Sequence, residues 1–467
     1  MPDVQVVVIG GGPGGYAAAF LAADLGLTTA LVDPEANPGG VCVYRGCIPS
    51  KALLHVANLV REARHADAWG ITFGDPTIDL AKLRGFKDTV VKRLTSGTGL
   101  LVKSRKVRYL QGRAEIVDAH TLTVKLASGG EDTVRFEHAI IATGSVPAIP
   151  PSLMLNDPRV MDSTAALDLP DIPKSMLVVG GGYIGLELGS VYAALGSNVS
   201  VVEMTGGLLP GADRDLVDVL AKSLGKTMKA VWLNTSVVKM SAEAAGIRVT
   251  FEGQPEQVFD RVLVAVGRRP NAGVPGLDRT RVTLNQRGFI QVDQQLRTAE
   301  PSIFAIGDVV GEPMLAHKAS HEGRTAVEVI AGHKAAFEPR AIPAVVFTDP
   351  ELAWAGLTET QAQRAGRAVA VAKFPWAASG RALTLDRADG LTKLILDPAT
   401  ERILGIGLVG PNAGELIAEG VLAIEMGANA TDLKLSIHPH PTLTETLMES
   451  AEVFFGQATH VYKPKRA

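Results

Sequence analysis

The sequence repeats one pattern at two places: a strand, a glycine-rich turn, a helix and a second strand that ends in an acid. In the first copy the β-branched run Val4–Ile9 leads straight into a GxGxxG motif, and the second strand ends at Asp33. Glycines here permit a tight turn and let the backbone amides at a helix start meet a pyrophosphate, while the acid can bind ribose hydroxyls. The motif glycines are Gly10, Gly12 and Gly15, with a helix predicted over residues 16–25 and a strand over 28–32.

The second copy starts with an apolar strand at residues 176–179 and ends at Glu203. Its glycines are Gly180, Gly182 and Gly185, and in both copies the acid follows the first glycine by 23 residues (10 to 33, 180 to 203). Two complete units predict two dinucleotide cofactors; a vestigial copy is the less favoured alternative, because each keeps its three glycines and its acid. Residues 204–207 contain no arginine for a 2′-phosphate, so the second unit favours NAD over NADP.

The only two cysteines of the chain, Cys42 and Cys47, lie together at a glycine-flanked helix start. Two buried, inert thiols are one interpretation, because most free cysteines pack as small hydrophobes. Against it, the helix dipole and the nearby cations Arg45 and Lys51 would favour a thiolate. We therefore favour a redox pair.

Composition limits the class of protein. A chain of 467 residues predicts two to four domains, and a formal net charge of −3 gives no sign of a nucleic-acid or anionic-membrane surface. The uncharged stretch 4–23 resembles a signal or membrane segment by hydropathy, but Asp3 precedes it and glycines interrupt it. Two cysteines make no disulfide scaffold, so we predict a soluble cytoplasmic protein.

Further apolar strands are predicted to complete both nucleotide-binding sheets. Residues 139–144 close the first fold, residues 262–267 close the second, and the proline-rich residues 146–151 cross between them. A third run, residues 303–308, ends at Asp308, whose carboxylate could reach a cofactor's ribityl hydroxyl. The alternative is an N-cap for the helix expected after Met314.

From residue 341 onward the pattern indicates an antiparallel sheet followed by helices. The predicted strands cover 345–347, 369–374, 391–396 and 403–409, with a turn at 397–400, a helix over 414–426 and another helix ending near 455.

The motif HPHPTLTE at residues 438–445 precedes that last helix. His440 stands between two prolines and could supply a base near neutral pH, with its tautomer fixed by Glu445. A surface loop whose Glu445 merely favours a helix N-terminus is equally compatible with the spacing.

Together these motifs resemble the pyridine nucleotide–disulfide oxidoreductases, and within that family most closely the branch that oxidises dihydrolipoyl groups. The resemblance covers essentially the whole chain. It rests on both GxGxxG units and on GGVCVYRGCIPSK (39–51), VGRRPN (266–271), AIGD (305–308), MLAHKA (314–319) and HPHPTLTE (438–445).

The resemblance implies a homodimeric flavoenzyme with FAD on the first unit and NAD on the second. A dihydrolipoyl thiol would attack Cys42, and Cys47 would lie next to the flavin. His440, paired with Glu445, would come from the partner subunit and take the substrate proton. Lys51 would lie near the flavin N5, and Glu187 would lie near the nicotinamide, paired with Lys51. The partners would be lipoylated acyltransferases or carrier proteins of a 2-oxoacid dehydrogenase or glycine-cleavage complex, which the sequence does not choose between.

The implied domains are 1–149 (FAD-binding, with the redox disulfide), 150–272 (NAD-binding), 273–342 (completing the FAD site) and 343–467 (dimerisation). No metal site is implied. The implied cofactor contacts are Gly10, Gly12, Pro13, Gly14, Gly15, Asp33, Gly40, Val41, Lys51, Ala114, Ala142, Thr143, Gly144, Gly307, Asp308, Met314, Leu315, Ala316, His317, Gly180, Gly182, Tyr183, Ile184, Gly185, Glu187, Glu203, Val237 and Gly267.

Some positions depart from the family pattern. Arg45, beside the cysteine pair, could alter its potential or a thiolate pKa, and Asp33 stands where a longer glutamate is usual. Three relatives on the same fold are less favoured. Glutathione-type reductases need arginines that bind NADP, which are missing after the second unit, and mercuric and large thioredoxin reductases use an additional redox pair near the C-terminus, where this chain has no cysteine after Cys47. A soluble transhydrogenase would need no cysteine pair. A non-catalytic flavoprotein subunit is a more distant alternative, because Cys42, Cys47 and His440 are all present.

Overall fold

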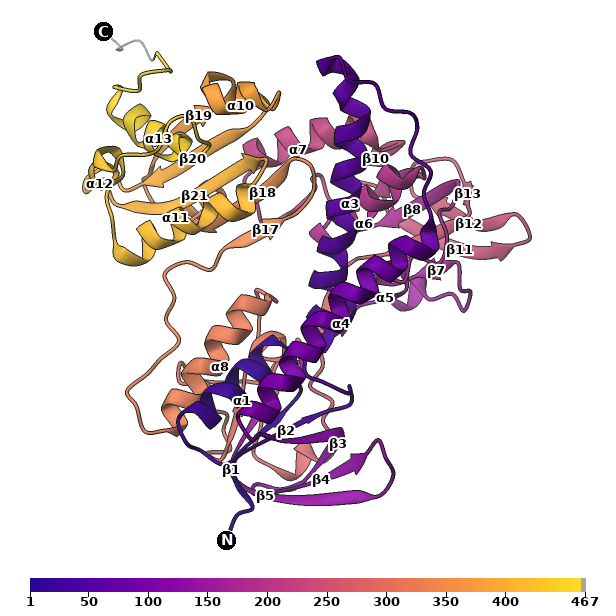
Figure 1. Ribbon diagram of the computed structural model, residues 1–467, viewed down its shortest axis with the longest axis vertical. Coiled ribbons are helices and arrows are strands. Elements are labelled where there is room, and N and C mark those ends of the chain that lie inside the picture. Colours follow the sequence, from indigo (N-terminus) through magenta and orange to yellow (C-terminus); the bar gives the residue numbers. More distant parts are fainter. Residues whose placement is uncertain (463–467) are drawn as a thin grey trace.

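The computed structural model describes residues 1–462, and these form two nucleotide-binding units and a C-terminal domain (Figure 1). The first unit holds the N-terminus, the second lies at the far end of two long helices, and the C-terminal domain follows a long linker. This is the α/β architecture that the repeated glycine units predict.

The first unit is a parallel sheet in the order β3-β2-β1-β5-β16, extended by an antiparallel hairpin through β4. Helices α1 and α8 pack against each other on this sheet. The elements are β1 (Val4–Ile9), α1 (Pro13–Asp24), β2 (Thr29–Asp33), β3 (Arg108–Asp118), β4 (Thr121–Leu126), β5 (Glu131–Ile141), β16 (Ile303–Ala305) and α8 (Ala316–Ile330). The strand predicted at 139–144 is the end of a much longer β5, whose exposed half belongs to the hairpin.

The second unit repeats the arrangement in the order β10-β9-β8-β14-β7, with all pairs parallel. A short antiparallel ribbon of β6 and β15 joins the two units, and a three-stranded meander covers one side of the second. The elements are β6 (Ser145–Pro147), β7 (Val160–Met161), α5 (Ser163–Leu167), β8 (Ser175–Val179), α6 (Tyr183–Leu195), β9 (Asn198–Val202), α7 (Arg214–Thr227), β10 (Ala230–Trp232), β11 (Val237–Glu243), β12 (Gly246–Phe251), β13 (Gln257–Phe259), β14 (Arg261–Val264) and β15 (Arg268–Pro270).

Two long helices run between the units, α3 (Cys47–His65) and α4 (Leu80–Ser104), after the short α2 (Gly40–Arg45). Leu53 and Ala57 of α3 share a buried apolar cluster with Leu188 of α6. Because α3 begins at the first unit and packs on the second, its first turn, which carries Cys47, is held between them.

The C-terminal domain is an antiparallel sheet in the order β17-β18-β21-β20-β19 with helices packed against it. The sequence prediction omits β18, which pairs along its whole length with β21. The elements are β17 (Ala344–Val346), β18 (Glu351–Gly356), α9 (Glu359–Arg364), β19 (Ala370–Pro375), α10 (Gly380–Thr384), β20 (Leu391–Leu396), β21 (Ile403–Gly410), α11 (Ala413–Met426), α12 (Ala430–Leu435) and α13 (Glu445–Phe455).

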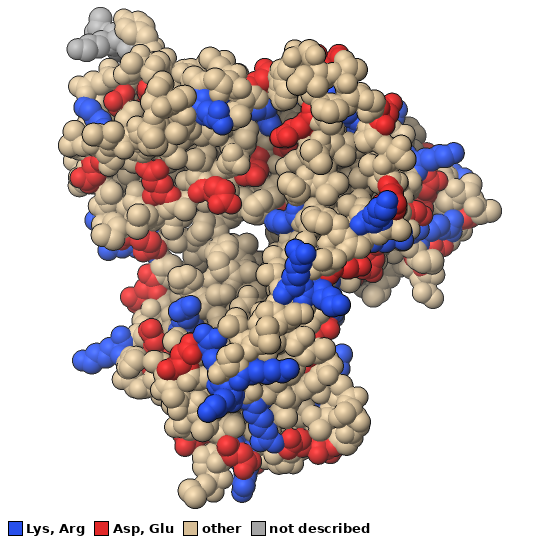
Figure 2. Space-filling model, viewed as in Figure 1, with Lys and Arg blue, Asp and Glu red and all other residues tan. Residues whose placement is uncertain are grey.

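The surface carries both signs of charge. Figure 2 shows a gap between the C-terminal domain and the first unit, with Lys and Arg side chains gathered on the first unit where α4 passes. Within residues 1–462, no helix combines the length and the apolar character that crossing a bilayer requires.

Candidate active site

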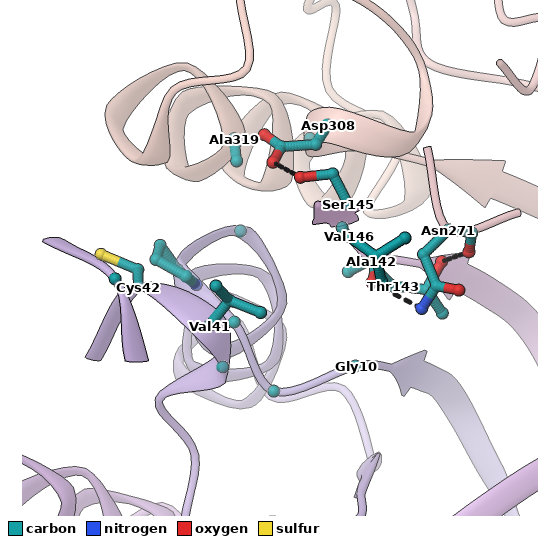
Figure 3. A pocket seen from close by; sticks show the side chains of 18 of the residues that line it. Gly10, Val41, Cys42, Ala142, Thr143, Ser145, Val146, Asn271, Asp308 and Ala319 are labelled. Atoms are coloured by element: carbon teal, nitrogen blue, oxygen red, sulfur yellow. Dashed lines mark hydrogen bonds between the residues drawn. The ribbon is translucent and has the colours of Figure 1, made fainter. Parts of the chain in front are cut away.

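A cavity of about 580 Å³ lies where the first unit, the second unit and α3 meet (Figure 3). Its walls are the glycine turn after β1, the cysteine segment, the ends of the parallel strands of the first sheet, and the start of α6. Ligands of open α/β sheets bind at this carboxyl edge of the strands.

Backbone lines much of this cavity because its loops approach too closely for side chains. Gly10 has φ +107°, and a Cβ there would overlap the carbonyl of Ala142. A Cβ on Gly40 would overlap the Cα of Gly12. Backbone amides and the N-terminus of α1, which begins at Pro13, are thereby left facing the cavity.

Asp33 closes the glycine turn from the end of β2. Its carboxylate accepts the Gly11 N–H at 2.5 Å and the Glu35 N–H at 2.9 Å. In the second unit Glu203 accepts the N–H groups of Gly181 and Thr205 in the same way, at 2.7 and 2.8 Å. Burial raises the pKa of Asp33 to about 6, against the hydrogen bond from Gly11, which lowers it.

The raised pKa of Asp33 gives a pH-dependent prediction. The folded apoprotein binds this proton more tightly than the unfolded chain, so stability is lost as pH rises from about 4 to about 6. We expect Asp33→Asn to raise the unfolding free energy of the apoprotein at pH 7, by up to about 3 kcal/mol, and yet to weaken dinucleotide binding. Urea unfolding of both apoproteins at low and neutral pH tests this, and a variant that is less stable at neutral pH would contradict it.

The cysteine pair spans the junction between α2 and α3. Both cysteines carry free thiols. The Cys42 thiol donates a hydrogen bond that lowers the pKa of Cys47 to about 7; burial opposes the shift and the Lys51 charge assists it. The same bond and burial raise the pKa of Cys42. In the reduced pair Cys42 therefore holds its proton, and Cys47 becomes the thiolate.

Lys51 lies one helical turn after Cys47 and is fixed by two elements that are distant in sequence. Its Nζ lies 2.8 Å from Oε2 of Glu187 on α6 and 4.4 Å from the ring centroid of Phe347. The Phe347 N–H donates to the other oxygen of Glu187 at 3.0 Å. Glu187, an unusual charge in an apolar helix, thus has a partner, and the C-terminal domain contributes Phe347 to the site.

Asp308 does not cap α8, whose N-cap is Leu315. Its carboxylate instead accepts the Ser145 hydroxyl at 2.5 Å, and that hydroxyl accepts the Arg268 Nε–H at 2.7 Å (Figure 3 shows the first bond). Ser145 and Arg268 come from the β6–β15 ribbon, and the sequence analysis missed both. The only signal for Arg268 is its place in the VGRRPN motif.

Arg45 contacts Glu35 and not the cysteine sulfurs. Arg45 is not among the main causes of the pKa shifts of Cys42 and Cys47, while its charge lowers the pKa of Asp33. Its charge thus stabilises the acidic end of the cavity, and an effect of Arg45 on the cysteine pair stays a prediction.

His440 and Glu445 lie on the C-terminal domain and are absent from the described residues that line the cavity. His440 Nδ1 lies 2.9 Å from Oε1 of Glu445, and the Thr442 N–H donates to Oε2 at 2.7 Å. Burial alone would raise the pKa of Glu445, but these two hydrogen bonds lower it. The His440 side chain is 72% exposed, and among the described residues its ring is hydrogen-bonded through Nδ1 alone, which leaves Nε2 available to a ligand.

The structure brings most of the remaining candidates to the cavity wall. They are Gly14, Val41, Ala114, Thr143, Gly144, Tyr183, Ile184, Gly307, Met314 and Ala316. Others lie off this wall: Gly15, Leu315 and His317 in the first unit, and Gly180, Gly182, Gly185, Glu203, Val237 and Gly267 in the second. Of these, His317 bonds the Pro343 carbonyl through Nε2 at 2.8 Å.

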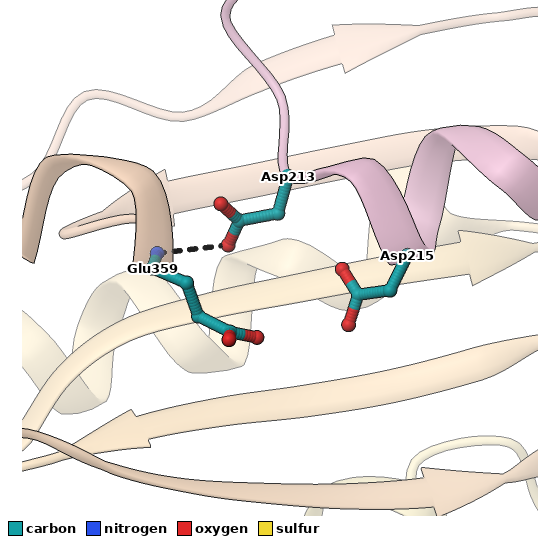
Figure 4. Close-up of side chains that lie close together, drawn as sticks. All are labelled: Asp213, Asp215 and Glu359. Carbon is teal, nitrogen blue, oxygen red and sulfur yellow. Dashed lines mark hydrogen bonds between the residues drawn. The ribbon is translucent and has the colours of Figure 1, made fainter. Parts of the chain in front are cut away.

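A second cluster of carboxylates joins the second unit to the C-terminal domain. Asp213, Asp215 and Glu359 lie close enough to suggest a cation site (Figure 4). The Nζ of Lys393 lies 2.8, 2.8 and 2.7 Å from these carboxylates, and its side chain is 1% exposed. Burial would lower the pKa of Lys393, but its bonds to the acids raise it. The cluster is an ion network that fixes one domain against the other.

Lys393→Met would leave three carboxylates without their central cation, so we expect a loss of about 3–5 kcal/mol in unfolding free energy. Lys373 is the matched control, because it contacts Asp215 and Glu359 at 2.7 and 3.3 Å but is 41% exposed. Lys373→Met should cost below about 1 kcal/mol. Thermal unfolding of both variants tests the difference; equal losses would show that burial of Lys393 is unimportant.

The chain is similar to known proteins along nearly its whole length. Residues 4–323 match the family model for pyridine nucleotide-disulphide oxidoreductases, and residues 342–451 match that family's dimerisation domain. The chain is 50% identical to a dihydrolipoyl dehydrogenase of Haemophilus influenzae, covering 99% of this chain and 97% of the relative. It is 48% identical to one of Vibrio cholerae (99% and 98% covered) and 46% identical to one of Geobacillus stearothermophilus (98% and 98%).

Solved structures agree in fold. LpdA from Mycobacterium tuberculosis superposes with a TM-score of 0.89 at 28% identity, covering 96% of this chain and 99% of that one. The HOCl-induced flavoprotein disulfide reductase RclA from Escherichia coli gives 0.86 at 29% identity, covering 97% and 99%. The two glycine units, the cysteine pair between them and the matching C-terminal domain place this chain in the pyridine nucleotide–disulphide oxidoreductase family.

Proposed function

We propose that the chain oxidises dihydrolipoyl groups on lipoylated proteins and passes the electrons through Cys42, Cys47 and FAD to NAD+. The observation that carries the proposal is the position of the cysteine pair: Cys42 and Cys47 lie together on the wall of the cavity that the first glycine turn also lines, beside Lys51, whose charge lowers the pKa of Cys47. Full-length relatives at 46–50% identity bear the name dihydrolipoyl dehydrogenase.

The family uses FAD and NAD(H), and the cavity residues fit FAD. Backbone amides of the Gly10–Gly12 turn and the start of α1 suit a pyrophosphate. The carboxylates of Asp33 and Asp308 lie on the cavity wall, where each can accept hydrogen bonds from hydroxyls. In the second unit Glu203 is the corresponding acceptor, with no neighbouring arginine in residues 204–207, which favours NAD.

In the oxidised enzyme, His440 takes the proton of the first dihydrolipoyl thiol, the resulting thiolate attacks Cys42 Sγ, the Cys42–Cys47 bond breaks, and Cys47 leaves as a thiolate. The lowered pKa of Cys47 makes it the better leaving group. The second dihydrolipoyl sulfur then attacks the lipoyl sulfur bonded to Cys42 and closes the lipoyl disulfide, and Cys42 leaves as a thiol with the proton of the second dihydrolipoyl group. When bound, FAD supplies two-electron transfer from the reduced pair to NAD+. Lys51, held by Glu187, places a positive charge beside the Cys47 thiolate.

We propose that His440 acts on the cysteine pair of a second copy of the chain. The matched dimerisation domain, the exposed side chain of His440 and its absence from the residues that line the cavity of its own chain support a shared site. Glu445 would hold Nδ1 in its protonated form, which leaves Nε2 to accept the thiol proton.

The proposed partners are lipoylated acyltransferases or carrier proteins of a 2-oxoacid dehydrogenase or glycine-cleavage complex, and the proposed compartment is the cytoplasm. The names of the relatives and the two-cysteine composition support this assignment.

Anaerobic titration of the purified protein with dihydrolipoamide, followed by NAD+, tests the proposal. We expect the flavin spectrum to gain a long-wavelength band from the Cys47 thiolate and then to reoxidise as NADH appears. A flavin that stays oxidised with dihydrolipoamide would overturn the substrate, and the absence of flavin would overturn the cofactor assignment.

A further inference from the structure

The loop that carries His440 contains a second histidine in the opposite environment. His438 is only 7% exposed, whereas His440 is 72% exposed. His438 Nδ1 lies 2.8 Å from the carbonyl oxygen of Ser436, and its Nε2 lies 2.8 Å from Oε1 of Glu419 on α11. His438 is therefore anchored through both ring nitrogens, and His440 through one.

The two partners of His438 hold its ring from opposite sides. The Ser436 carbonyl lies at Nδ1, and the Glu419 carboxylate lies at Nε2. The ring orientation is therefore fixed by one contact within the loop and one contact with α11.

The other hydrogen bonds of this loop go to the loop itself and to the start of α13. The Thr442 hydroxyl donates to the Pro439 carbonyl at 2.7 Å, and the remaining bonds of Thr442 and His440 go to Thr444 and to Glu445, the first residue of α13. Within the described residues, the contact between His438 and Glu419 is the one hydrogen bond from residues 437–442 to α11. Glu445 thus holds the His440 ring on α13, and Glu419 holds the preceding part of the loop on α11.

We infer that His438 is a positioning residue: its contact with Glu419 holds the loop on α11 and so keeps His440 Nε2 in place for the substrate thiol. The inference rests on the proposed function only for the role of His440. The tether itself is a property of this chain's geometry.

Two substitutions separate the two bonds of His438. Glutamine places an amide N–H close to the position of Nε2 and keeps the bond to Glu419; asparagine places it close to Nδ1 and loses that bond. We expect His438→Asn and Glu419→Ala each to slow reduction of the enzyme by dihydrolipoamide about tenfold, and His438→Gln to slow it less than about threefold. The double variant His438→Asn, Glu419→Ala should be no slower than either single variant, because both remove one contact.

The matched control is His65→Asn, which removes another histidine–carboxylate contact of 2.8 Å, with Asp386, far from this loop in the sequence. It should leave both half-reactions unchanged. Reduction by NADH, read with an artificial electron acceptor, should also be unchanged in the His438 and Glu419 variants, because that half does not use His440. Equal losses in both half-reactions, or an unchanged rate for His438→Asn, would overturn the inference.

Amide hydrogen exchange gives a readout that does not depend on activity. His438→Asn and Glu419→Ala should speed exchange in residues 437–442 without changing α11 itself. Unchanged exchange in this loop would overturn the tether. If dihydrolipoamide did not reduce the wild-type enzyme, the proposed function would be wrong. The hydrogen-exchange rates of residues 437–442 would still show whether the His438–Glu419 contact holds the loop on α11.

Discussion

Cys42→Ser is expected to lower the rate of dihydrolipoamide oxidation by about a thousandfold or more, because a serine oxygen cannot form the mixed disulfide. The loss should be confined to the dithiol half-reaction. A serine hydroxyl can still donate the hydrogen bond that lowers the pKa of Cys47, so the Cys47 thiolate should persist at neutral pH. Steady-state assays with dihydrolipoamide, and with NADH and an artificial acceptor, measure the two halves separately.

Cys42→Ala is the matched comparison for the serine variant. It removes the same sulfur atom and also the hydrogen-bond donor, so the pKa of Cys47 should rise and the thiolate fraction at pH 7 should fall. Ultraviolet thiolate absorbance across a pH series distinguishes the two variants. Turnover by Cys42→Ser near the wild-type rate, with FAD and dimer intact, would refute the relay through this pair.

The nucleotide-binding units could be predicted from the sequence because their determinants are local. A glycine at φ +107°, a β-branched strand before it and an acid at a fixed distance all lie within one stretch of chain. The His440–Glu445 pair could also be predicted from local sequence, because the two residues are five apart. In the structure they form a 2.9 Å hydrogen bond.

The remainder of the site depends on contacts between distant residues, which no local pattern encodes. Ser145 and Asp308 are 163 residues apart, and Lys51 and Glu187 are 136 apart. Strand β18 was missed because its alternation is weak: Leu352, Ala353 and Ala355 are all buried. The partner of Arg45 could not be predicted either, because nearness to the cysteines in sequence does not fix the direction of a long side chain, which here reaches Glu35.

Sequence also could not separate functional from structural charges. Lys393 reads as an ordinary lysine in a strand, yet it is among the largest fully buried side chains and neutralises acids from α7 and α9. Lys51 reads the same way, with one acid partner on the cavity wall. What distinguishes them is the surrounding space: the Lys393 acids enclose their cation, whereas Lys51 borders a cavity that can admit a ligand.

His440→Gln is expected to slow oxidation of dihydrolipoamide by about a hundredfold to ten-thousandfold, because the substrate thiol loses its base. The NADH-dependent half-reaction should be unaffected. Glutamine places its amide close to the position of Nε2, so the variant loses the Nδ1 contact with Glu445 but leaves Glu445 bonded to the Thr442 N–H.

Hybrid dimers decide which chain supplies the base. A dimer of one Cys42→Ser subunit and one His440→Gln subunit contains one cysteine pair, in the second subunit, and one base, in the first. If the base acts across the interface, that dimer has one complete site, so a hybrid purified by two different tags should show about half the wild-type activity per dimer. If the base acted within its own chain, neither site would be complete and the hybrid would be as inactive as its parents. Because His440 lies off the cavity wall of its own chain, we expect recovery.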